Sequence, residues 1–424
     1  MAETRPRVVV VGGGFGGLYA AMALRDAPVL VTLCDRNNYH LFQPLLYQVA
    51  TGGLSTEEIA APIRRILRSQ QNADVLLMDV QAVDLERREV VHGQGRLSYD
   101  YLVVATGARH AYFGHGEWEA DAPGLKTIDD ALAIRRRIYM AYEEAERCTD
   151  ASLLPAFLDF VVVGGGPTGV EMAGAIAEIA RRTLRRDFRH IDPASSRIIL
   201  VEAGPRVLPG FPAQLSAKAM QELTAMGVEV RLGTPVTGVS ADGVQLGDTW
   251  IPSRTVIWAA GVEASPLGRS LADPADRAGR VEVAADLSLP GHPEVFVVGD
   301  LALVPGSDGR PLPGLAPVAM QEGRTAARNI ARRIGGQPTT PFRYRDRGVL
   351  ATIGRRAAVA DVRGVRLTGF PAWLAWLFVH ILYLIGFDNR VVVLWRWAYA
   401  YVTFERAARL ITGAAAQQDF MGGH

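Results

Sequence analysis

The feature that most constrains the fold is a pattern that occurs twice in 424 residues. A β-branched run over Arg7–Val11 enters a glycine turn, a helix predicted over Phe15–Leu24, and a strand over Leu30–Cys34 that ends in Asp35. A second β-branched run begins the same order again at Asp159–Val163. Strand, glycine turn, helix and strand in this order are typical of a doubly wound α/β fold with a parallel sheet. Two copies about 150 residues apart therefore predict two Rossmann-like domains.

The first glycine turn predicts a dinucleotide site. Its residues are Gly12, Gly13, Gly14, Phe15, Gly16 and Gly17. Glycines at the first, third and sixth positions permit a tight turn, close approach of a pyrophosphate, and close packing of helix on strand. The N-terminus of the helix supplies unpaired N–H groups to the phosphates. Asp35, which lies 18 residues after Gly17, is placed to accept hydrogen bonds from ribose hydroxyls.

The second glycine turn predicts another such site. Its residues are Gly164, Gly165, Gly166, Pro167, Thr168 and Gly169. The acid that ends the next strand, Glu202, lies 33 residues after Gly169. We expect the Arg-rich stretch between them to form a longer helix and a loop. A carboxylate here favours NADH, because it would repel the 2′-phosphate of NADPH, whereas the nearby Arg206 leaves NADPH as an alternative.

Two shorter signals resemble elements of flavoproteins with two dinucleotide sites. They are Ala105-Thr106-Gly107 and Gly299-Asp300, each after a predicted strand. Residues 35–54, 166–171, 258–262 and 314–323 narrow the resemblance to type II (alternative) NADH:quinone oxidoreductases, across nearly the whole chain. The resemblance implies a single-subunit respiratory dehydrogenase that does not pump protons, with non-covalent FAD as cofactor, NADH as substrate and the quinone pool as acceptor. A protein of this kind aligns the nicotinamide with the flavin and needs no nucleophile.

The resemblance also assigns roles to single residues. Glu202 corresponds to the contact with the NADH ribose, Gly261 to a turn in the nicotinamide domain, and Glu171 to a glutamate beside the nicotinamide and quinone approach to the flavin. Glu171 is the one candidate catalytic acid; the alternative is an acid that interacts with the dipole of its helix. The residues predicted to contact FAD, besides the first glycine turn, are Asp35, Arg36, Val80, Thr106, Gly107 and Asp300.

The segment Ala316–Glu322 resembles the quinone-site motif of the family, of the form AQxAxQQ. The predicted quinone residues are Pro317, Ala319, Gln321 and Glu322. Proline replaces the first glutamine and glutamate the last. Because proline has neither a side-chain donor nor a backbone N–H, one hydrogen bond to a quinone is lost, which leaves the identity of the acceptor open. We expect a helix over Gln321–Ile334.

The last part of the chain predicts attachment to a membrane surface. Ala372–Phe387 is apolar except for His380, but it is shorter than the roughly 20 residues that span a bilayer. Its Trp, Tyr and Arg flanks suggest an interfacial element within residues 365–412; the alternative is a dimer interface or a core element. We expect a peripheral protein on the cytoplasmic face of the bacterial inner membrane, which could form a homodimer.

The predicted domains are an FAD domain (residues 1–112 and 274–345), an inserted NADH domain (113–273) and a C-terminal attachment region (346–424). A formal net charge of +1 gives no overall attraction to nucleic acid. The chain has two cysteines, Cys34 and Cys148, and no CxxC pair, which argues against a local redox disulfide and a cysteine-rich metal site. The alternative functions are a ferredoxin- or sulfide-linked reductase, or a non-catalytic flavin sensor.

Overall fold

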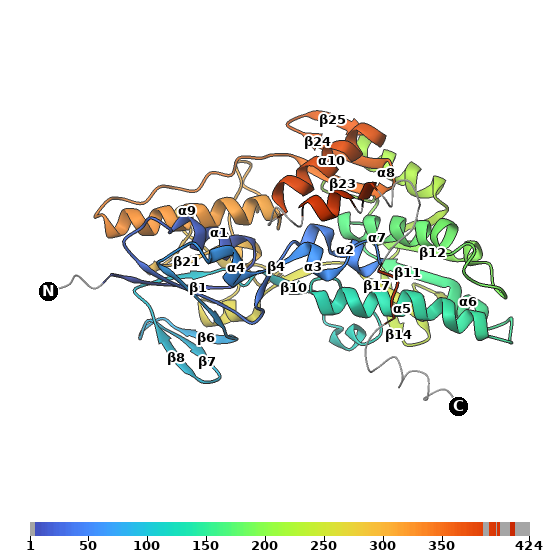
Figure 1. Ribbon diagram of the computed structural model, residues 1–424, viewed down its shortest axis with the longest axis horizontal. Helices are drawn as coiled ribbons and strands as arrows, with labels where there is room; N and C mark the ends of the chain where they lie inside the picture. The colour runs from blue at the N-terminus through green and yellow to red at the C-terminus, as the bar shows by residue number, and fades with distance from the viewer. Residues whose placement is uncertain (1–4, 385–389, 396, 399–407, 412–424) are drawn as a thin grey trace. The chain divides into compact units, whose positions relative to one another are not determined.

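The computed structural model describes residues 5–384, 390–395, 397–398 and 408–411. The chain divides into two compact units (Figure 1). Unit 1 comprises Met1–Leu41, Ala60–Arg109 and Val262–Asp346, and unit 2 comprises Phe42–Ile59, His110–Gly261 and Arg347–His424. Unit 1 therefore contains the first glycine turn, and unit 2 contains the second. The described part of the C-terminal segment groups with unit 2.

The core of unit 1 is a six-stranded sheet whose central strand is the first β-branched run. Val8, Val9 and Val10 of that strand are buried, because a parallel sheet covered on both faces needs continuous apolar strands. All neighbouring strands are parallel except the edge strand β20. The order across the sheet is β20 (Ser288–Leu289), β21 (His292–Val297), β9 (Tyr101–Val104), β1 (Arg7–Val11), β2 (Leu30–Asp35) and β5 (Ala73–Leu77).

Two helices of unit 1 pack against each other, α1 (Phe15–Ala23) and α9 (Ala316–Ile334). Their approach requires a glycine, because a Cβ atom at Gly323 would lie 2.1 Å from the carbonyl oxygen of Gly16. Helix α9 begins five residues before the predicted start, since Pro317 lies in its first turn, where proline is favoured. An antiparallel meander follows β5, formed by β6 (Val80–Asp84), β7 (Glu89–His92) and β8 (Gly95–Ser98).

Unit 2 repeats this architecture. Its parallel sheet has the order β13 (Val228–Leu232), β12 (Arg197–Glu202), β11 (Asp159–Val163) and β17 (Thr255–Trp258). A meander follows β13 here too, formed by β14 (Val236–Ser240), β15 (Gly243–Leu246) and β16 (Thr249–Pro252). The strand order corresponds to β5, β2, β1 and β9 of unit 1, so the predicted duplication of a Rossmann-like α/β fold is confirmed.

The helices of unit 2 include one that begins at the second glycine turn, α7 (Pro167–Glu178). It continues as a π-helical turn over Ile179–Thr183, so the longer helix expected in the Arg-rich stretch extends by only one turn. Helix α5 (Ile128–Arg147) starts with a capping box between Thr127 and Asp130, and α8 (Ala213–Ala225) precedes β13.

Residues 36–70, where no helix or strand is predicted above, contain short elements. Strands β3 (Tyr39–Leu41) and β4 (Ala60–Pro62) pair within unit 1, followed by helix α4 (Ile63–Leu67). Helices α2 (Leu46–Ala50) and α3 (Thr56–Ile59) belong to unit 2. These elements are too short for the sequence to show a period.

The C-terminal part of unit 2 contains an antiparallel sheet and helix α10 (Gly369–Tyr383). The strands are β23 (Val349–Gly354), β24 (Ala357–Val362) and β25 (Val365–Thr368), and α10 packs on β24. Helix α10 buries Ala372 and Trp376. Among the described residues, no helix is long and apolar enough to cross a membrane. Within the predicted attachment region, residues 390–395 and 397–398 are also helical, whereas 385–389, 396, 399–407 and 412–424 lie outside the described residues.

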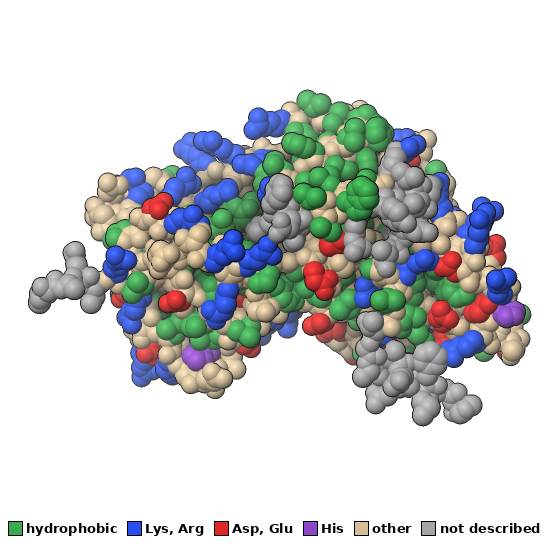
Figure 2. Space-filling model, viewed as in Figure 1, with side chains coloured by type: hydrophobic (Ala, Val, Ile, Leu, Met, Phe, Trp, Pro, Cys, Tyr) green, Lys and Arg blue, Asp and Glu red, His purple; other side chains and the backbone are tan. Residues whose placement is uncertain are grey.

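One face of α10 is exposed and apolar. Phe370, Leu374, Phe378 and Leu382 follow one another at intervals of four residues, and each is between 45% and 65% exposed. Residues four apart lie on the same side of a helix, so these side chains form a stripe. Figure 2 shows hydrophobic side chains gathered over the surface that α10 and β25 form.

Candidate functional site

The glycine turn of unit 1 has the geometry that the fingerprint requires. Gly12 has a φ of +103°, a conformation that side chains disfavour. A Cβ atom at Gly17 would lie 1.8 Å from the carbonyl oxygen of Gly12, so helix and strand can approach only with glycine there. Gly14, the N-cap of α1, has no other atom within 4 Å of where a Cβ would be. The turn therefore leaves open space in front of the N–H groups at the start of α1, as an anionic group needs.

Asp35 lies beside this turn and holds it. Its Oδ2 atom accepts a hydrogen bond from the Gly13 N–H at 2.5 Å, and its Oδ1 atom accepts one from the Asn37 N–H at 2.6 Å. Burial raises the pKa of Asp35, while these two hydrogen bonds oppose the rise. His40 adds a third contact, since its Nδ1 atom lies 2.9 Å from the Gly13 carbonyl oxygen. The predicted ribose acid is thus also a structural part of the turn.

A cavity of about 440 Å³ lies in the same unit. Its walls include Gly299 and Asp300, which follow β21, and Ala319 and Glu322 of α9. Glu322 is 1% exposed, and its Oε2 atom accepts a hydrogen bond from the Gly299 N–H at 2.6 Å. Burial raises the pKa of Glu322 to about 8; the Gly299 hydrogen bond opposes the rise and the Asp300 charge adds to it.

The remaining residues predicted to contact FAD lie in unit 1. The Thr106 hydroxyl is buried and has no hydrogen-bond partner among the described residues. Thr106 follows β9 directly after Ala105, whose carbonyl oxygen would contact a Cβ at Gly12. Gly107 has a φ of +67°, Arg36 is exposed and Val80 begins β6. A buried hydroxyl without a partner costs free energy, which a ligand at this position would recover.

The glycine turn of unit 2 repeats the geometry of the first. Gly164 has a φ of +109°, and a Cβ at Gly169 would lie 1.8 Å from the Gly164 carbonyl oxygen. Gly166 has open space where a Cβ would be. Glu202 holds this turn as Asp35 holds the first, because its Oε2 atom accepts a hydrogen bond from the Gly165 N–H at 2.6 Å. The long spacing between turn and acid does not change this arrangement.

Glu202 and Arg206, which lie near the second turn, make further hydrogen bonds. The second carboxylate oxygen of Glu202 accepts a hydrogen bond from the Gly204 N–H at 2.6 Å. Arg206 donates a hydrogen bond to the Pro209 carbonyl oxygen. Thr168 is partly exposed in the first turn of α7, and Gly261 has a φ of +76°.

Glu171 lies on α7 after the first helical turn. Burial raises its pKa to about 8, and a backbone hydrogen bond with Thr352 of β23 opposes the rise. A helix dipole would lower the pKa of an acid near the N-terminus, so desolvation outweighs it here. The carboxyl group is therefore mostly protonated at neutral pH, which suits a proton donor.

Of the four residues predicted to bind a quinone, two line the cavity of unit 1 and two do not. Ala319 and Glu322 line the cavity of unit 1. The Gln321 amide is engaged with Arg345, whose backbone N–H it accepts at 3.0 Å and whose carbonyl oxygen it donates to at 3.1 Å. Pro317 starts α9. The structural role of Glu322 beside Gly299 was missed from the sequence, because the two residues are 23 positions apart and no local pattern links them.

No group of three or more His, Cys, Asp or Glu residues in the described part of the chain could hold a metal ion. The polar groups at the two turns are backbone N–H groups and one carboxylate each, with His40 beside the first turn.

Comparison with known proteins identifies the family. Residues 6–323 match the sequence profile described as pyridine nucleotide-disulphide oxidoreductase. The chain is 46% identical over 424 aligned residues to the type II NADH:quinone oxidoreductase Ndh of Mycobacterium tuberculosis, covering 96% of this chain and 90% of that protein. This chain belongs to the type II NADH:quinone oxidoreductase family. The predicted resemblance is confirmed.

Solved structures agree with this type II oxidoreductase fold. The NDH2 of Plasmodium falciparum in complex with NADH matches with a TM-score of 0.84 at 21% identity, over 96% of this chain and all of that one. The sulfide:quinone oxidoreductase of Aquifex aeolicus matches with a TM-score of 0.72 at 18% identity, over 99% of this chain and 96% of that one. Because both folds match at low identity, the fold alone does not separate the two activities.

Proposed function

We propose that this chain oxidises NADH and reduces a quinone, with non-covalent FAD held in unit 1 and NADH bound in unit 2. In the overall reaction, NADH, a proton and the quinone become NAD⁺ and the quinol. The observation that carries the proposal is the duplicated glycine turn. In both units the first glycine has a positive φ (+103° and +109°), a later glycine permits close approach of the helix, and a carboxylate accepts a backbone N–H of the turn. The family adds the pairing of NADH with a quinone acceptor.

FAD fits the residues of unit 1. The open space at Gly14 and the N-terminus of α1 suit its pyrophosphate. The unpartnered Thr106 hydroxyl offers a hydrogen bond, and Asp300 lines the 440 Å³ cavity. When bound, FAD supplies the two-electron chemistry that no amino-acid side chain provides. The protein then has to hold, orient and exclude water from it.

The residues of unit 2 favour NADH over NADPH. Both carboxylate oxygens of Glu202 accept backbone N–H groups, so the acid is fixed where the adenosine ribose is expected. A 2′-phosphate there would meet a fixed negative charge. Arg206 donates to Pro209 instead of pairing with Glu202. We therefore expect NADPH to be oxidised more slowly than NADH.

Glu171 supplies the proton in this proposal. Quinone reduction consumes protons as well as electrons, and burial keeps the carboxyl group protonated at neutral pH. Its hydrogen bond with the backbone of Thr352 fixes the group between α7 and β23. Donation to the quinone, followed by uptake of a proton from solvent, would complete a cycle.

We propose that the apolar stripe of α10 lies in the surface of a membrane. Four exposed large apolar side chains on one side of a 15-residue helix match an interfacial helix. A quinone pool lies within the membrane and NADH in the cytoplasm, which favours the cytoplasmic face of the inner membrane. Homodimer formation remains a prediction.

The runner-up activity, sulfide oxidation, is disfavoured by the cysteines. Burial raises the pKa of the Cys34 thiol to about 11, with a further rise from the Asp35 charge. A thiol with so high a pKa is unreactive, because the thiolate is the nucleophile. Cys148 belongs to the other unit. A ferredoxin-linked reductase and a flavin sensor are distinguished by experiment.

The test is anaerobic mixing of the purified, detergent-solubilised protein with NADH, and separately with NADPH, followed by a short-chain quinone. We expect rapid loss of flavin absorbance with NADH, slow loss with NADPH, and prompt recovery on addition of quinone. Flavin reduction without recovery by quinone would contradict quinone reduction and favour another acceptor or a sensor. A purified protein without flavin would refute the proposal.

A further inference from the structure

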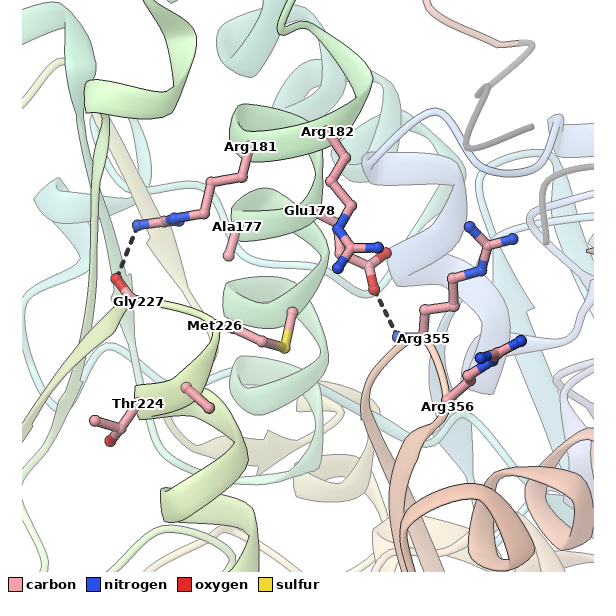
Figure 3. Close-up of a pocket in the computed structure, with 10 residues that line it drawn as sticks. Ala177, Glu178, Arg181, Arg182, Thr224, Met226, Gly227, Arg355 and Arg356 are labelled. Atoms are coloured by element: carbon pink, nitrogen blue, oxygen red, sulfur yellow. Dashed lines mark hydrogen bonds between the residues drawn. The ribbon is translucent and has the colours of Figure 1, made fainter. Parts of the chain in front are cut away.

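A second cavity, of about 580 Å³, lies within unit 2 away from the glycine turn. Its walls are the end of α7 with the π-helical turn Ile179–Thr183, the end of α8, and the turn between β23 and β24. Figure 3 shows Arg181, Arg182 and Glu178 extending from the helix, and Arg355 and Arg356 from the turn opposite. None of these residues belongs to the nucleotide site described above.

The ionisable groups that line this cavity are mostly positive. Four are arginines and one is Glu178, so the lining carries three positive charges in excess (four minus one), whereas the whole chain carries +1. Glu178 is fixed at the edge of this group, because its Oε1 atom accepts the backbone N–H of Arg355 at 2.5 Å. The concentration of guanidinium groups favours an anion.

One nitrogen of the Arg181 guanidinium group lacks a hydrogen-bond acceptor in the described part of the chain. Its Nη2 atom donates to the Gly227 carbonyl oxygen at 3.0 Å at the end of α8. Its Nη1 atom is buried and has no hydrogen-bond partner among the described residues. A buried guanidinium nitrogen without an acceptor is costly, and a phosphate oxygen in the cavity would satisfy it. Guanidinium groups bind phosphate through paired hydrogen bonds.

We propose that this pocket binds a phosphate-bearing anion, and that its occupancy alters the surroundings of Glu171. The second part rests on the proposed function, whereas the first does not. The ligand is either a soluble phosphate ester or the headgroup of an anionic phospholipid, since both present the same phosphate oxygens to arginine. The volume of the cavity exceeds that of a single phosphate and leaves room for an attached group.

The connection to Glu171 runs through two packed elements. Glu171, Gly174 and Glu178 lie on one side of α7, at intervals of three and four residues. Each meets the strand β23 or its turn: Glu171 at Thr352, Gly174 at Ile353 and Glu178 at Arg355. A Cβ at Gly174 would lie 1.7 Å from the Ile353 carbonyl oxygen, so helix and strand are in direct backbone contact.

Because of this contact, we expect α7 and β23 to move together when an anion binds. Glu171 and Glu178 are separated by seven residues, roughly 10 Å along the helix. An anion that attracts the Arg355 side chain would also shift the backbone of Arg355, whose N–H donates to Glu178. Thr352, which bonds to Glu171, lies on β23, three residues before Arg355. A shift of this strand therefore changes the hydrogen bond at Glu171.

The experiment measures pyrophosphate binding to the full-length, flavin-loaded protein by isothermal titration calorimetry. Saturating NAD⁺ is present, so that pyrophosphate does not enter the second glycine turn. The variant is Arg182→Gln with Arg356→Gln, both exposed enough to be replaced without opening the core. The control is Arg269→Gln with Arg310→Gln, which removes the same charge at exposed positions of unit 1. We expect binding to weaken about tenfold or more in the variant and to be unchanged in the control.

Vesicle flotation distinguishes the two sources of phosphate. The protein is mixed with vesicles of phosphatidylcholine alone or with phosphatidylglycerol added. A lipid headgroup as ligand predicts that phosphatidylglycerol increases flotation of the wild type and the control but not of the variant. A soluble ligand predicts equal flotation of all three, together with the difference in pyrophosphate binding. Equal pyrophosphate binding and equal flotation in all three proteins would overturn the proposed site.

The coupling to Glu171 has its own measurement. The rate of flavin reduction by NADH and of reoxidation by quinone is followed with and without pyrophosphate. We expect at least a twofold change in reoxidation in the wild type and the control, and none in the variant. Binding without any change in reoxidation would overturn the coupling and leave the anion site. Loss of quinone reactivity in every protein would instead refute the proposed function.

Discussion

The two glycine turns allow a sharp test of which nucleotide binds where. Replacing Gly17 by alanine places a methyl group 1.8 Å from the Gly12 carbonyl oxygen, and replacing Gly169 does the same at Gly164. Since carbon and oxygen atoms normally approach no closer than about 3.3 Å, helix and turn must separate by roughly 1.5 Å. Overpacking of this kind costs about 1–3 kcal/mol. If this cost falls on the turn geometry that binds the nucleotide, it corresponds to roughly 5- to 150-fold weaker binding.

The assay separates the two sites. Flavin content per chain is measured from absorbance after gel filtration, and NADH binding from the concentration dependence of flavin reduction. We expect Gly17→Ala to lose flavin during purification. We expect Gly169→Ala to keep its flavin but to require higher NADH concentrations for the same rate of reduction.

The same turns provide matched controls. Gly14 and Gly166 have ordinary φ values of −68° and −71° and no atom within 4 Å of a new Cβ, so their alanine variants should fold with unchanged thermal stability. Their methyl groups would nevertheless occupy the open space expected to hold a pyrophosphate. If Gly14→Ala keeps wild-type flavin affinity and Gly166→Ala keeps wild-type NADH affinity, the reasoning about the turns is refuted.

Three further predictions concern proton transfer, stability and the membrane. Because the pKa of Glu171 is about 8, the rate of quinone reduction should fall as pH rises past about 8. The variant Glu171→Gln should have a lower kcat at pH 7 and should not show this decline. If the variant keeps the pH profile of the wild type, Glu171 is not the proton donor. Burial raises the pKa of Glu322 from 4.5 to about 8, so its stabilising contribution is full below about 4.5 and is lost as pH rises through about 8. Thermal unfolding at pH 5 to 8 should show a shallower loss of stability in Glu322→Gln, by up to a few kcal/mol, and parallel curves would contradict this. Leu374→Glu with Phe378→Glu should reduce flotation with vesicles and leave flavin reduction by NADH unchanged, whereas Leu77→Glu, an equally exposed site in unit 1, should float as the wild type does.

Much of the fold could be predicted from short-range patterns. The β-branched runs, the glycine turns and the acids that end β2 and β12 are contiguous in sequence, and their period and composition dictate strand, turn and helix. The duplication followed directly from them. The short elements of residues 36–70 and the early start of α9 at Ala316 were missed, because elements of three to five residues show no period and a proline was interpreted as a lost contact instead of a helix start.

The site was predicted less completely than the fold. The sequence indicated Asp35 and Glu202 as ribose acids, but it did not indicate that both hold their turns through backbone N–H groups. Two roles for Glu171 were open from the sequence; the structure favours the proton donor, because its pKa is raised by burial and not lowered by the helix dipole. Burial depends on what packs around a side chain, and β23 comes from nearly 180 residues further along the chain.

The sequence by itself therefore determined that this protein has two repeats of a dinucleotide-binding fold, since φ preferences and hydrophobic period are local properties of the chain. Only the tertiary structure decided which side chains meet. It brought Glu322 to Gly299, Gln321 to Arg345, and the arginines at 181, 182, 355 and 356 around one cavity. The physical reason is that desolvation and convergence of charge depend on the packing of distant elements, and no short stretch of sequence carries that information.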